Sequence, residues 1–328
     1  MKRLFTFSVI VFLLFNFATH INVGLTSSSN LDNCNTALKK GEGCFDYKIK
    51  DLNFSIPVYY YLPNEPNQLN PNTKVVFVLH GEHRNAQDYR NEWQNIYAEN
   101  KNFILLAPKF DQKRFPKAAG YNLGNMFTED LNTLNPQNQW AFTQIENIFD
   151  FVKETTKVKT ANYYLYGHSA GAQFVHRMLI FMPDARIKKA VAAEANSYTV
   201  PSYHTEYPCG LKKKMGDKLP PLDLRTTFKI PMTIEIGTVD NKDSSDSFGC
   251  GKQEEVSNNS SEQSSNEHFI HGEYFFSHAQ NIAKNMNENF QWTLKKVITQ
   301  SHEDPMFVSC AALEFFPQLK GVTCQSEP

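Results

Sequence analysis

Short apolar runs alternate with segments of helical periodicity along most of the chain. Near-continuous apolar runs bounded by turn residues are typical of parallel strands that are buried on both faces. We expect such strands at residues 74–79, 103–108, 163–166, 189–193, 230–237 and 292–299. Apolar residues recur at helical spacing at residues 85–99, 140–153, 172–182, 273–286 and 304–316. This alternation predicts an α/β fold, with a mostly parallel central sheet covered by helices on both faces, in a single domain from residue 29 to residue 328.

Other segments depart from the alternation. Residues 47–50 and 58–61 have strand-like composition and predict an antiparallel pair at one edge of the sheet. Residues 196–227 are rich in Pro, Tyr and Lys, and residues 243–266 in Ser, Asn, Gln and Glu. Both segments follow predicted strands at the sheet edge where α/β proteins build their sites. We expect the first to be a small flap over the site or else a solvated loop, and the second to be a surface loop.

Charge and composition narrow the class of protein. A formal net charge of -1 over 328 residues gives no reason to expect nucleic acid as a partner. Lys2 and Arg3 precede an apolar run at residues 4–17, and polar sequence follows up to about Asn30. This is typical of a signal peptide, placed approximately at residues 1–28, and the run is short for a membrane span. We expect a secreted or periplasmic protein with no stable membrane insertion after cleavage; an uncleaved anchor is the alternative.

The chain has six cysteines, and an even number in an exported protein favours disulfides. No pair has the C-x-x-C spacing of a zinc or redox site. Two pairs are close in sequence and would each close a local loop, which leaves one cysteine in each irregular segment. The predicted disulfides are therefore Cys34–Cys44, Cys310–Cys324 and Cys209–Cys250.

The sequence YYLYGHSAGAQFVHRMLIFM, at residues 163–182, contains the candidate nucleophile. An aromatic run predicts a strand, Gly167-His-Ser-Ala-Gly171 has the form G-x-S-x-G, and a helical pattern follows. Such a strand–turn–helix exposes a serine above the sheet at a helix N-terminus, and the glycines allow the sharp turn and close helix packing. Ser169 is therefore the predicted nucleophile. The alternative is a Gly-rich turn with a capping serine.

A serine nucleophile needs a base and an acid that orients the base, and in this fold they follow it in the order acid, histidine. Asp240 comes after a Gly in the turn that follows the strand at residues 230–237. His302 precedes the last helix, where Asp304 and Pro305 resemble an N-cap and a first helical residue. The predicted triad is Ser169, Asp240 and His302.

Alternatives to this triad remain open. Glu194, after the preceding strand, is the rival acid, and Asp243 is a weaker one. His168 neighbours the nucleophile without the reach of a base, and His176 is expected on a helix surface. His268, His271 and His278 become candidate bases only if the last strand is misplaced.

Acyl transfer also needs hydrogen-bond donors for a tetrahedral oxyanion. One predicted donor is the backbone N–H of Ala170, directly after the nucleophile. The other is the N–H of Glu82, because Gly81 permits close backbone approach after the strand at residues 74–79. The Glu82 side chain would have to point away from a developing negative charge or pair with Arg84.

These motifs resemble those of the α/β-hydrolase superfamily. The match covers the mature chain by element order, with GHSAG at the nucleophile, LHG at the oxyanion strand, GTVD at the acid turn and SHEDP at the histidine loop. The stretches LHGEHRNAQDYRNEW, GYNLGNMF and YGHSAGAQFVHR are similar to a branch that includes secreted esterases and polyhydroxyalkanoate depolymerases. The resemblance implies a Ser-His-Asp serine hydrolase without metal or organic cofactor. The chain departs from the depolymerases in lacking a separate polymer-binding domain and in carrying Glu82 after His80-Gly81.

The leading functional hypothesis is an exported serine hydrolase that cleaves small or polymeric carboxylic esters through an acyl-Ser169 intermediate. A serine peptidase or amidase would use the same triad. A catalytically inactive binding protein on the same fold is a third hypothesis, and a complete set of catalytic residue types argues against it.

Overall fold

The structure is a computed structural model that describes residues 34, 37–50, 52–97, 103–212, 219, 222–239, 250 and 267–327. The predicted signal peptide, Asp240 and Asp243 lie outside the described residues. In the part of the chain that is described, no helix is long and apolar enough to cross a membrane.

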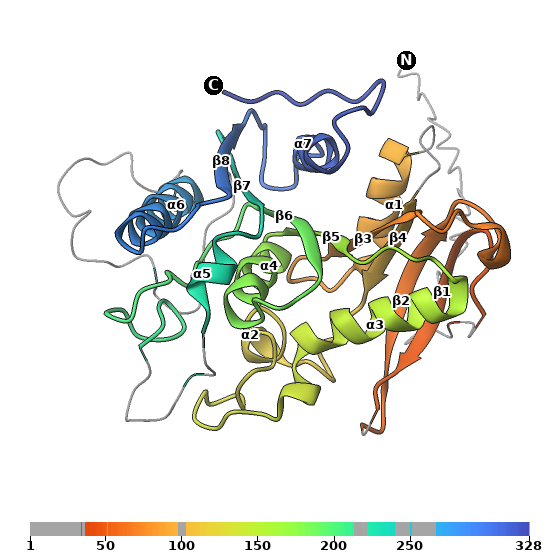
Figure 1. The fold of residues 1–328 in the computed structure, drawn as a ribbon, viewed down its shortest axis with the longest axis horizontal. Helices are drawn as coiled ribbons and strands as arrows, with labels where there is room; N and C mark the ends of the chain where they lie inside the picture. The colour runs from red at the N-terminus through yellow and green to blue at the C-terminus, as the bar shows by residue number, and fades with distance from the viewer. Residues whose placement is uncertain are drawn as a thin grey trace, which may run out of the picture. The chain divides into compact units, whose positions relative to one another are not determined.

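The sheet has eight strands in the order β1-β2-β4-β3-β5-β6-β7-β8 (Figure 1). The strands are β1 (Gly41–Lys48), β2 (Ser55–Leu62), β3 (Lys74–Leu79), β4 (Phe103–Pro108), β5 (Tyr163–His168), β6 (Ile187–Ala193), β7 (Met232–Gly237) and β8 (Trp292–Val297). β2 is antiparallel to both of its neighbours, and every pair from β4 to β8 is parallel. This confirms the predicted fold class.

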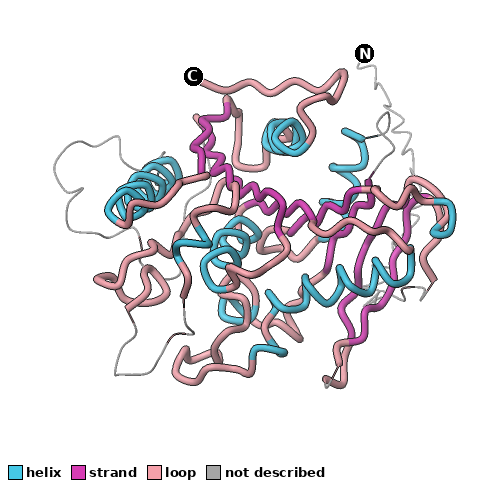
Figure 2. The backbone as a smooth tube through the Cα atoms, viewed as in Figure 1, coloured by secondary structure: helices cyan, strands magenta, loops and turns pink. Residues whose placement is uncertain are grey.

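Helices cover both faces of the sheet, as Figure 2 shows. α1 (Ala86–Tyr97) and α7 (Met306–Phe315) share one apolar layer with one face of the strands. α3 (Ala141–Thr156), α4 (Ala170–Phe181) and α6 (Glu267–Asn285) share the larger layer on the other face. The short elements are α2 (Lys117–Gly120), α5 (Leu224–Thr227), η1 (Pro66–Gln68) and η2 (Gln137–Gln139). The central strands are buried along almost their whole length, which explains their near-continuous apolar sequence.

The predicted edge pair exists, but its first strand is longer than expected. β1 begins at Gly41, which pairs with Leu62, and it continues to Lys48, which pairs with Ser55. Only Phe45 is fully buried among its residues, so the apolar pattern of this strand is weak and its first half escaped detection. α2 and η2 lie between β4 and α3, where no element was predicted from the sequence.

Disulfides join the three predicted cysteine pairs: Cys34–Cys44, Cys209–Cys250 and Cys310–Cys324. Cys209–Cys250 ties the irregular segment after β6 to the segment after β7. Cys310–Cys324 joins α7 to the chain that follows it.

Candidate active site

Ser169 stands at a strained turn between β5 and α4, as the sequence predicted. Its backbone has φ 55° and ψ -116°, a region that non-glycine residues rarely adopt. A Cβ atom at Gly167 would overlap the carbonyl of Gly171, and one at Gly171 would overlap the carbonyl of Leu79. Both glycines are therefore required for the helix to pack this close to the strands. The serine is consequently presented at the N-terminus of α4, where the positive end of the helix dipole lies.

His302 lies in the loop between β8 and α7, also as predicted, and only 5% of its surface is exposed. Asp304 fixes this loop by accepting the Met306 N–H at 2.9 Å and the Gln300 N–H at 2.7 Å. α7 begins one residue later than the sequence suggested, with Pro305 at the N-cap. Asp304 nevertheless caps the first turn through its side chain.

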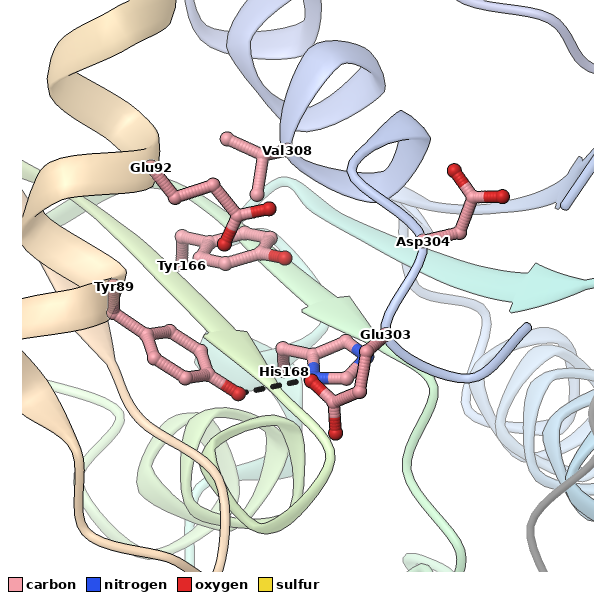
Figure 3. A pocket seen from close by; sticks show the side chains of 7 residues that line it. All are labelled: Tyr89, Glu92, Tyr166, His168, Glu303, Asp304 and Val308. Atoms are coloured by element: carbon pink, nitrogen blue, oxygen red, sulfur yellow. Dashed lines mark hydrogen bonds and ion pairs between the residues drawn. The ribbon is translucent and has the colours of Figure 1, made fainter. Parts of the chain in front are cut away.

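His168 connects the His302 loop to α1 (Figure 3). Its Nε2 lies 2.9 Å from the His302 carbonyl oxygen, and its Nδ1 lies 3.1 Å from the Tyr89 hydroxyl. A carbonyl only accepts, so Nε2 carries the proton and Nδ1 accepts from Tyr89. The Tyr89 hydroxyl also packs against Gly81, where an added Cβ atom would lie 3.0 Å from the hydroxyl oxygen. We call this path from Gly81 through Tyr89 and His168 to the His302 carbonyl the edge bridge.

The sequence did not predict the edge bridge. Tyr89 was only an apolar position on a helix, and His168 only a neighbour of the nucleophile. Their contact spans 79 residues, and that of His168 with His302 spans 134. Nothing in the local pattern indicates contacts of this separation.

His80 holds the predicted oxyanion loop in place. It is fully buried, and Nδ1–H donates to the Gly81 carbonyl at 2.9 Å while Nε2 accepts the Phe110 N–H at 3.1 Å. Its ring stacks on Tyr121, with the centroids 4.5 Å apart. Burial lowers the pKa of His80 to about 3, so the ring stays neutral and keeps both hydrogen bonds over the physiological pH range.

Arg84 also stabilises the predicted oxyanion loop. Its guanidinium donates to the carbonyls of Phe110 and Lys117, at 2.5 and 2.9 Å, and lies over the Tyr121 ring. Arg84 therefore points inward, whereas the Glu82 side chain is exposed.

A cavity of about 250 Å³ opens beside the elbow. It is lined by Gly81, Glu82, His83, Asn85, Tyr89, Ser169 and Glu303. The predicted nucleophile and the predicted oxyanion loop thus share one cavity, and the residue after His302 forms part of its wall. A small acyl or alcohol group could be accommodated there.

Asp240 itself lies outside the described residues, but the chain that leads to it is described. The Val239 N–H donates to the Thr299 hydroxyl at 3.2 Å, and that hydroxyl donates to the Val239 carbonyl at 3.0 Å. The residue before Asp240 is therefore held against the residue three positions before His302. Asp240 as the orienting acid remains a prediction.

Glu194, the rival acid, directly follows β6. Its backbone φ is 56°, and only 1% of its surface is exposed. One carboxylate oxygen accepts the Gly237 N–H at 2.5 Å, across the end of β7. Burial raises the pKa of Glu194 to about 8, against the opposing effect of that hydrogen bond. Its carboxyl group therefore bridges the ends of two strands and favours the protonated state at neutral pH.

The prediction that His176 lies on a helix surface is wrong. It is fully buried because the segment after β6 covers this face of α4. Its Nδ1 donates to the Ala172 carbonyl and its Nε2 accepts the Thr199 N–H at 3.0 Å. Arg177, equally buried, donates to the Thr199 hydroxyl at 2.8 Å. These bonds attach the predicted flap to the helix that carries Ser169.

One side-chain cluster in the described part of the chain has the composition of a metal site. His168, His302 and Glu303 each offer a ligand atom, and these atoms lie within 4.8 Å of one another.

Solved structures show what this chain is similar to. Poly(aspartic acid) hydrolase-1 from Sphingomonas sp. KT-1 is 32% identical, over 86% of this chain and 100% of that chain, with a TM-score of 0.70. A poly(3-hydroxybutyrate) depolymerase from Bordetella parapertussis is 25% identical, over 85% and 91% of the two chains, with a TM-score of 0.69. An S-formylglutathione hydrolase from Agrobacterium tumefaciens shares the fold, with a TM-score of 0.54. It is 15% identical, over 88% of this chain and 99% of that chain. No protein-family model and no curated protein sequence matches the chain.

Proposed function

Because the chain belongs to the α/β-hydrolase superfamily, in its polyhydroxyalkanoate-depolymerase-like branch, we propose that it is an exported serine hydrolase of carboxylic esters. The observation that carries the proposal is the strained turn at Ser169, which opens onto the same cavity as the Gly81–Glu82 backbone. Strain of this kind persists only where the surrounding structure enforces it, and it is common at active sites.

In the proposed reaction, the Ser169 hydroxyl attacks the ester carbonyl while His302 takes its proton. The N–H groups of Ala170 and Glu82 stabilise the tetrahedral oxyanion, helped by the N-terminus of α4. His302 then returns the proton to the departing alcohol and leaves an acyl-Ser169. A water molecule, deprotonated by His302, then attacks the acyl carbon. The bond to the Ser169 oxygen breaks, His302 returns the proton to that oxygen, and the carboxylic acid leaves. Asp240 orients the imidazole and stabilises its protonated form.

Burial of His302 supports this proposal. A base that is 5% exposed works in a medium of low dielectric, where fixed dipoles act more strongly than in water. The edge bridge holds the loop of this base and the oxyanion loop at a fixed separation. Proposed donors and base therefore belong to one connected unit.

Amide hydrolysis is the second candidate function. The 32% identical relative is a poly(aspartic acid) hydrolase, and the units of poly(aspartic acid) are joined by amide bonds. The same triad would serve, with His302 protonating a leaving amine. In the described part of the cavity, however, the carboxylates of Glu82 and Glu303 line the wall, which disfavours a polyanionic substrate. We therefore rank esters first.

A substrate panel tests both candidates. We expect p-nitrophenyl esters of graded acyl length to be hydrolysed with a kcat/KM well above that of matched anilides. The panel also includes two polymeric substrates, soluble poly(aspartic acid) and particles of poly(3-hydroxybutyrate). If the protein hydrolyses the anilides or poly(aspartic acid) faster than the esters, it is an amidase and the ester proposal is wrong. If a fluorophosphonate probe fails to label Ser169, the protein is a binding module instead.

Export is part of the proposal. The three disulfides fit an oxidising compartment, and an apolar run follows two basic residues at the N-terminus. Expression of the full chain, followed by N-terminal sequencing of the mature protein, should find it outside the cytoplasm and cut between residues 18 and 29. An uncut protein in the membrane fraction would favour the anchor.

A further inference from the structure

The carboxylate of Glu303 lies between two buried histidines. One of its oxygens lies 3.8 Å from His168 Nδ1, and the other lies 4.0 Å from His302 Nε2. The two imidazole rings are 4.9 Å apart between centroids. In the described residues, this is the place where three ligand-type side chains converge, with the ligand atoms within 4.8 Å of one another.

The spacing of these atoms is close to what a zinc ion requires. Zinc binds imidazole nitrogen at about 2.0–2.1 Å in tetrahedral geometry, which places ligand atoms roughly 3.3 Å apart. The two contacts of Glu303 exceed this spacing by about 0.5 and 0.7 Å, and no pair of ligand atoms exceeds it by more than about 1.5 Å. Because 62% of the Glu303 side chain is exposed, it can move inward at little packing cost. Three protein ligands would leave a fourth position open for water.

The orientation of His168 already suits a metal ligand. Its Nε2–H donates to the His302 carbonyl at 2.9 Å, which leaves the lone pair on Nδ1, on the side of Glu303. A hydrogen bond from the second ring nitrogen to a carbonyl is the usual support of a zinc-bound histidine. The Tyr89 hydroxyl donates to the same lone pair at 3.1 Å, so a metal ion would have to displace it.

We propose that His168, His302 and Glu303 form an inhibitory site for zinc or a similar late transition-metal ion. Binding rests on the geometry of the three side chains alone. Inhibition rests in addition on the proposed function, because a metal ion on His302 Nε2 would remove the base that takes the proton of Ser169. Nitrogen-rich ligation selects zinc, copper or nickel over magnesium and calcium, which prefer oxygen.

Binding is measured first without activity, on the folded Ser169→Ala protein. Titration calorimetry should show one zinc site, and cobalt(II) should give the visible absorption of a tetrahedral nitrogen-ligated ion. Magnesium and calcium at the same concentrations should give no signal. Equal binding of all four ions, or none of zinc and cobalt, overturns the site whether or not the protein is an esterase.

Substitution of two acidic residues of the same cavity, one at a time, distinguishes direct ligation of zinc from general attraction by negative charge. Glu303→Gln should weaken zinc binding by about tenfold or more, as loss of a direct ligand does at least as much as loss of an outer partner. Glu82→Gln removes the same charge from the cavity wall, and its zinc affinity should stay within about twofold. Equal loss in both variants, or loss in His83→Gln instead, would contradict the assigned ligands.

The kinetic consequence is tested on active enzyme, with each variant normalised to its own rate without metal. Zinc should inhibit ester hydrolysis and fluorophosphonate labelling, chelation should restore both, and Glu303→Gln should need about tenfold more zinc. Tyr89→Phe should need less zinc, because the hydroxyl no longer competes for His168. Zinc that binds but leaves hydrolysis unchanged would refute inhibition while leaving the ester proposal intact.

Discussion

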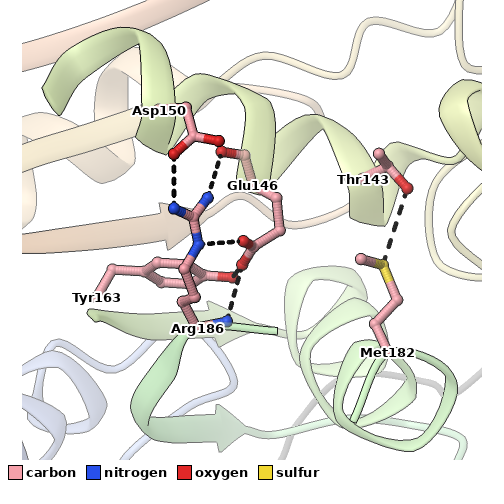
Figure 4. A network of polar contacts seen from close by, with 6 residues as sticks. All are labelled: Thr143, Glu146, Asp150, Tyr163, Met182 and Arg186. Atoms are coloured by element: carbon pink, nitrogen blue, oxygen red, sulfur yellow. Dashed lines mark hydrogen bonds and ion pairs between the residues drawn. The ribbon is translucent and has the colours of Figure 1, made fainter. Parts of the chain in front are cut away.

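The two ends of strands β5 and β6 carry polar networks that are built in opposite ways. At the ends where these strands begin, Arg186 donates to Glu146 at 2.6 Å and to Asp150 at 2.6 Å, and Tyr163 donates to Glu146 at 2.5 Å (Figure 4). At the ends where they finish, the edge bridge runs from the Tyr89 hydroxyl through His168 to the His302 carbonyl. The first network pairs opposite charges, whereas the hydrogen bonds of the edge bridge join a hydroxyl, an imidazole and a backbone carbonyl.

This difference indicates what each end is for. At the first end, hydrogen bonds between opposite charges attach α3 to the beginning of β5 and β6, which is a structural role. The edge bridge instead joins the loop of the proposed base to the helix that packs against Gly81, so it can set the relative positions of proposed catalytic groups. Losses of activity and losses of stability should therefore separate between the two ends.

Ser169→Ala should have the largest effect on activity. The hydroxyl is the proposed nucleophile, so kcat for p-nitrophenyl esters should fall by about four orders of magnitude or more. The free energy of unfolding should stay within about 1 kcal/mol, because the backbone of the turn tolerates alanine as it tolerates serine. Residual activity within tenfold of the wild type would remove Ser169 from the mechanism.

Substituting the two candidate acids decides which one orients His302. Asp240→Asn should reduce kcat by about 10⁴-fold, as loss of a triad acid does. Glu194→Gln keeps an oxygen for the Gly237 N–H and should retain most of the activity. The reverse pattern, measured at one pH on folded proteins, would identify Glu194 as the acid and Asp240 as a turn residue.

Glu194 should also make stability depend on pH. Its folded pKa of about 8 lies above the unfolded value of 4.5. The unfolded chain therefore loses this proton first, and the stability that the group contributes below about pH 4.5 is lost as pH rises toward 8. The free energy of unfolding should fall by a few kcal/mol over this range in the wild type and less in Glu194→Gln. Parallel urea-unfolding curves of both proteins across pH 5–8 test this, and identical pH dependence would contradict it.

Glu146→Gln tests the opposite end. It leaves the Arg186 guanidinium with Asp150 and weakens the bonds from Tyr163 and Arg186, so we expect a loss of about 2 kcal/mol in the free energy of unfolding. Because Glu146 contacts the beginning of β5 and Ser169 follows its end, kcat/KM should stay within about twofold. Thermal unfolding and initial rates measure the two quantities, and a large loss of activity in the folded variant would show that the ends are coupled.

The sequence predicted those parts of the molecule whose signal is local. Buried strands such as β3 and β4 read as continuous apolar runs, and the turn at Ser169 requires two glycines at fixed positions. The edge bridge could not be predicted, because Tyr89 and His168 meet only after the sheet brings distant segments together. His176 was misplaced for a related reason. Periodicity describes the face that a helix turns to the sheet, and here a second segment covers the other face.

A matched pair of tyrosines gives the smallest and most discriminating effect. Tyr89→Phe and Tyr163→Phe each delete one buried hydroxyl that donates a hydrogen bond, to His168 in one case and to Glu146 in the other. Both should cost about 1 kcal/mol of stability. Only Tyr89→Phe should lower kcat, by about tenfold with little change in KM, because it loosens the oxyanion loop relative to the His302 loop.

The proposed difference between the two ends of the strands is supported if Tyr89→Phe and Tyr163→Phe are equally stable but differ in kcat. Urea unfolding and full Michaelis–Menten curves on both variants supply the two measurements. If both substitutions lower kcat alike, the effect of Tyr89 is one of general stability. If neither does, the bridge only holds the fold together, and the His302 loop is positioned by the Asp304 cap and the contact of Thr299 with Val239.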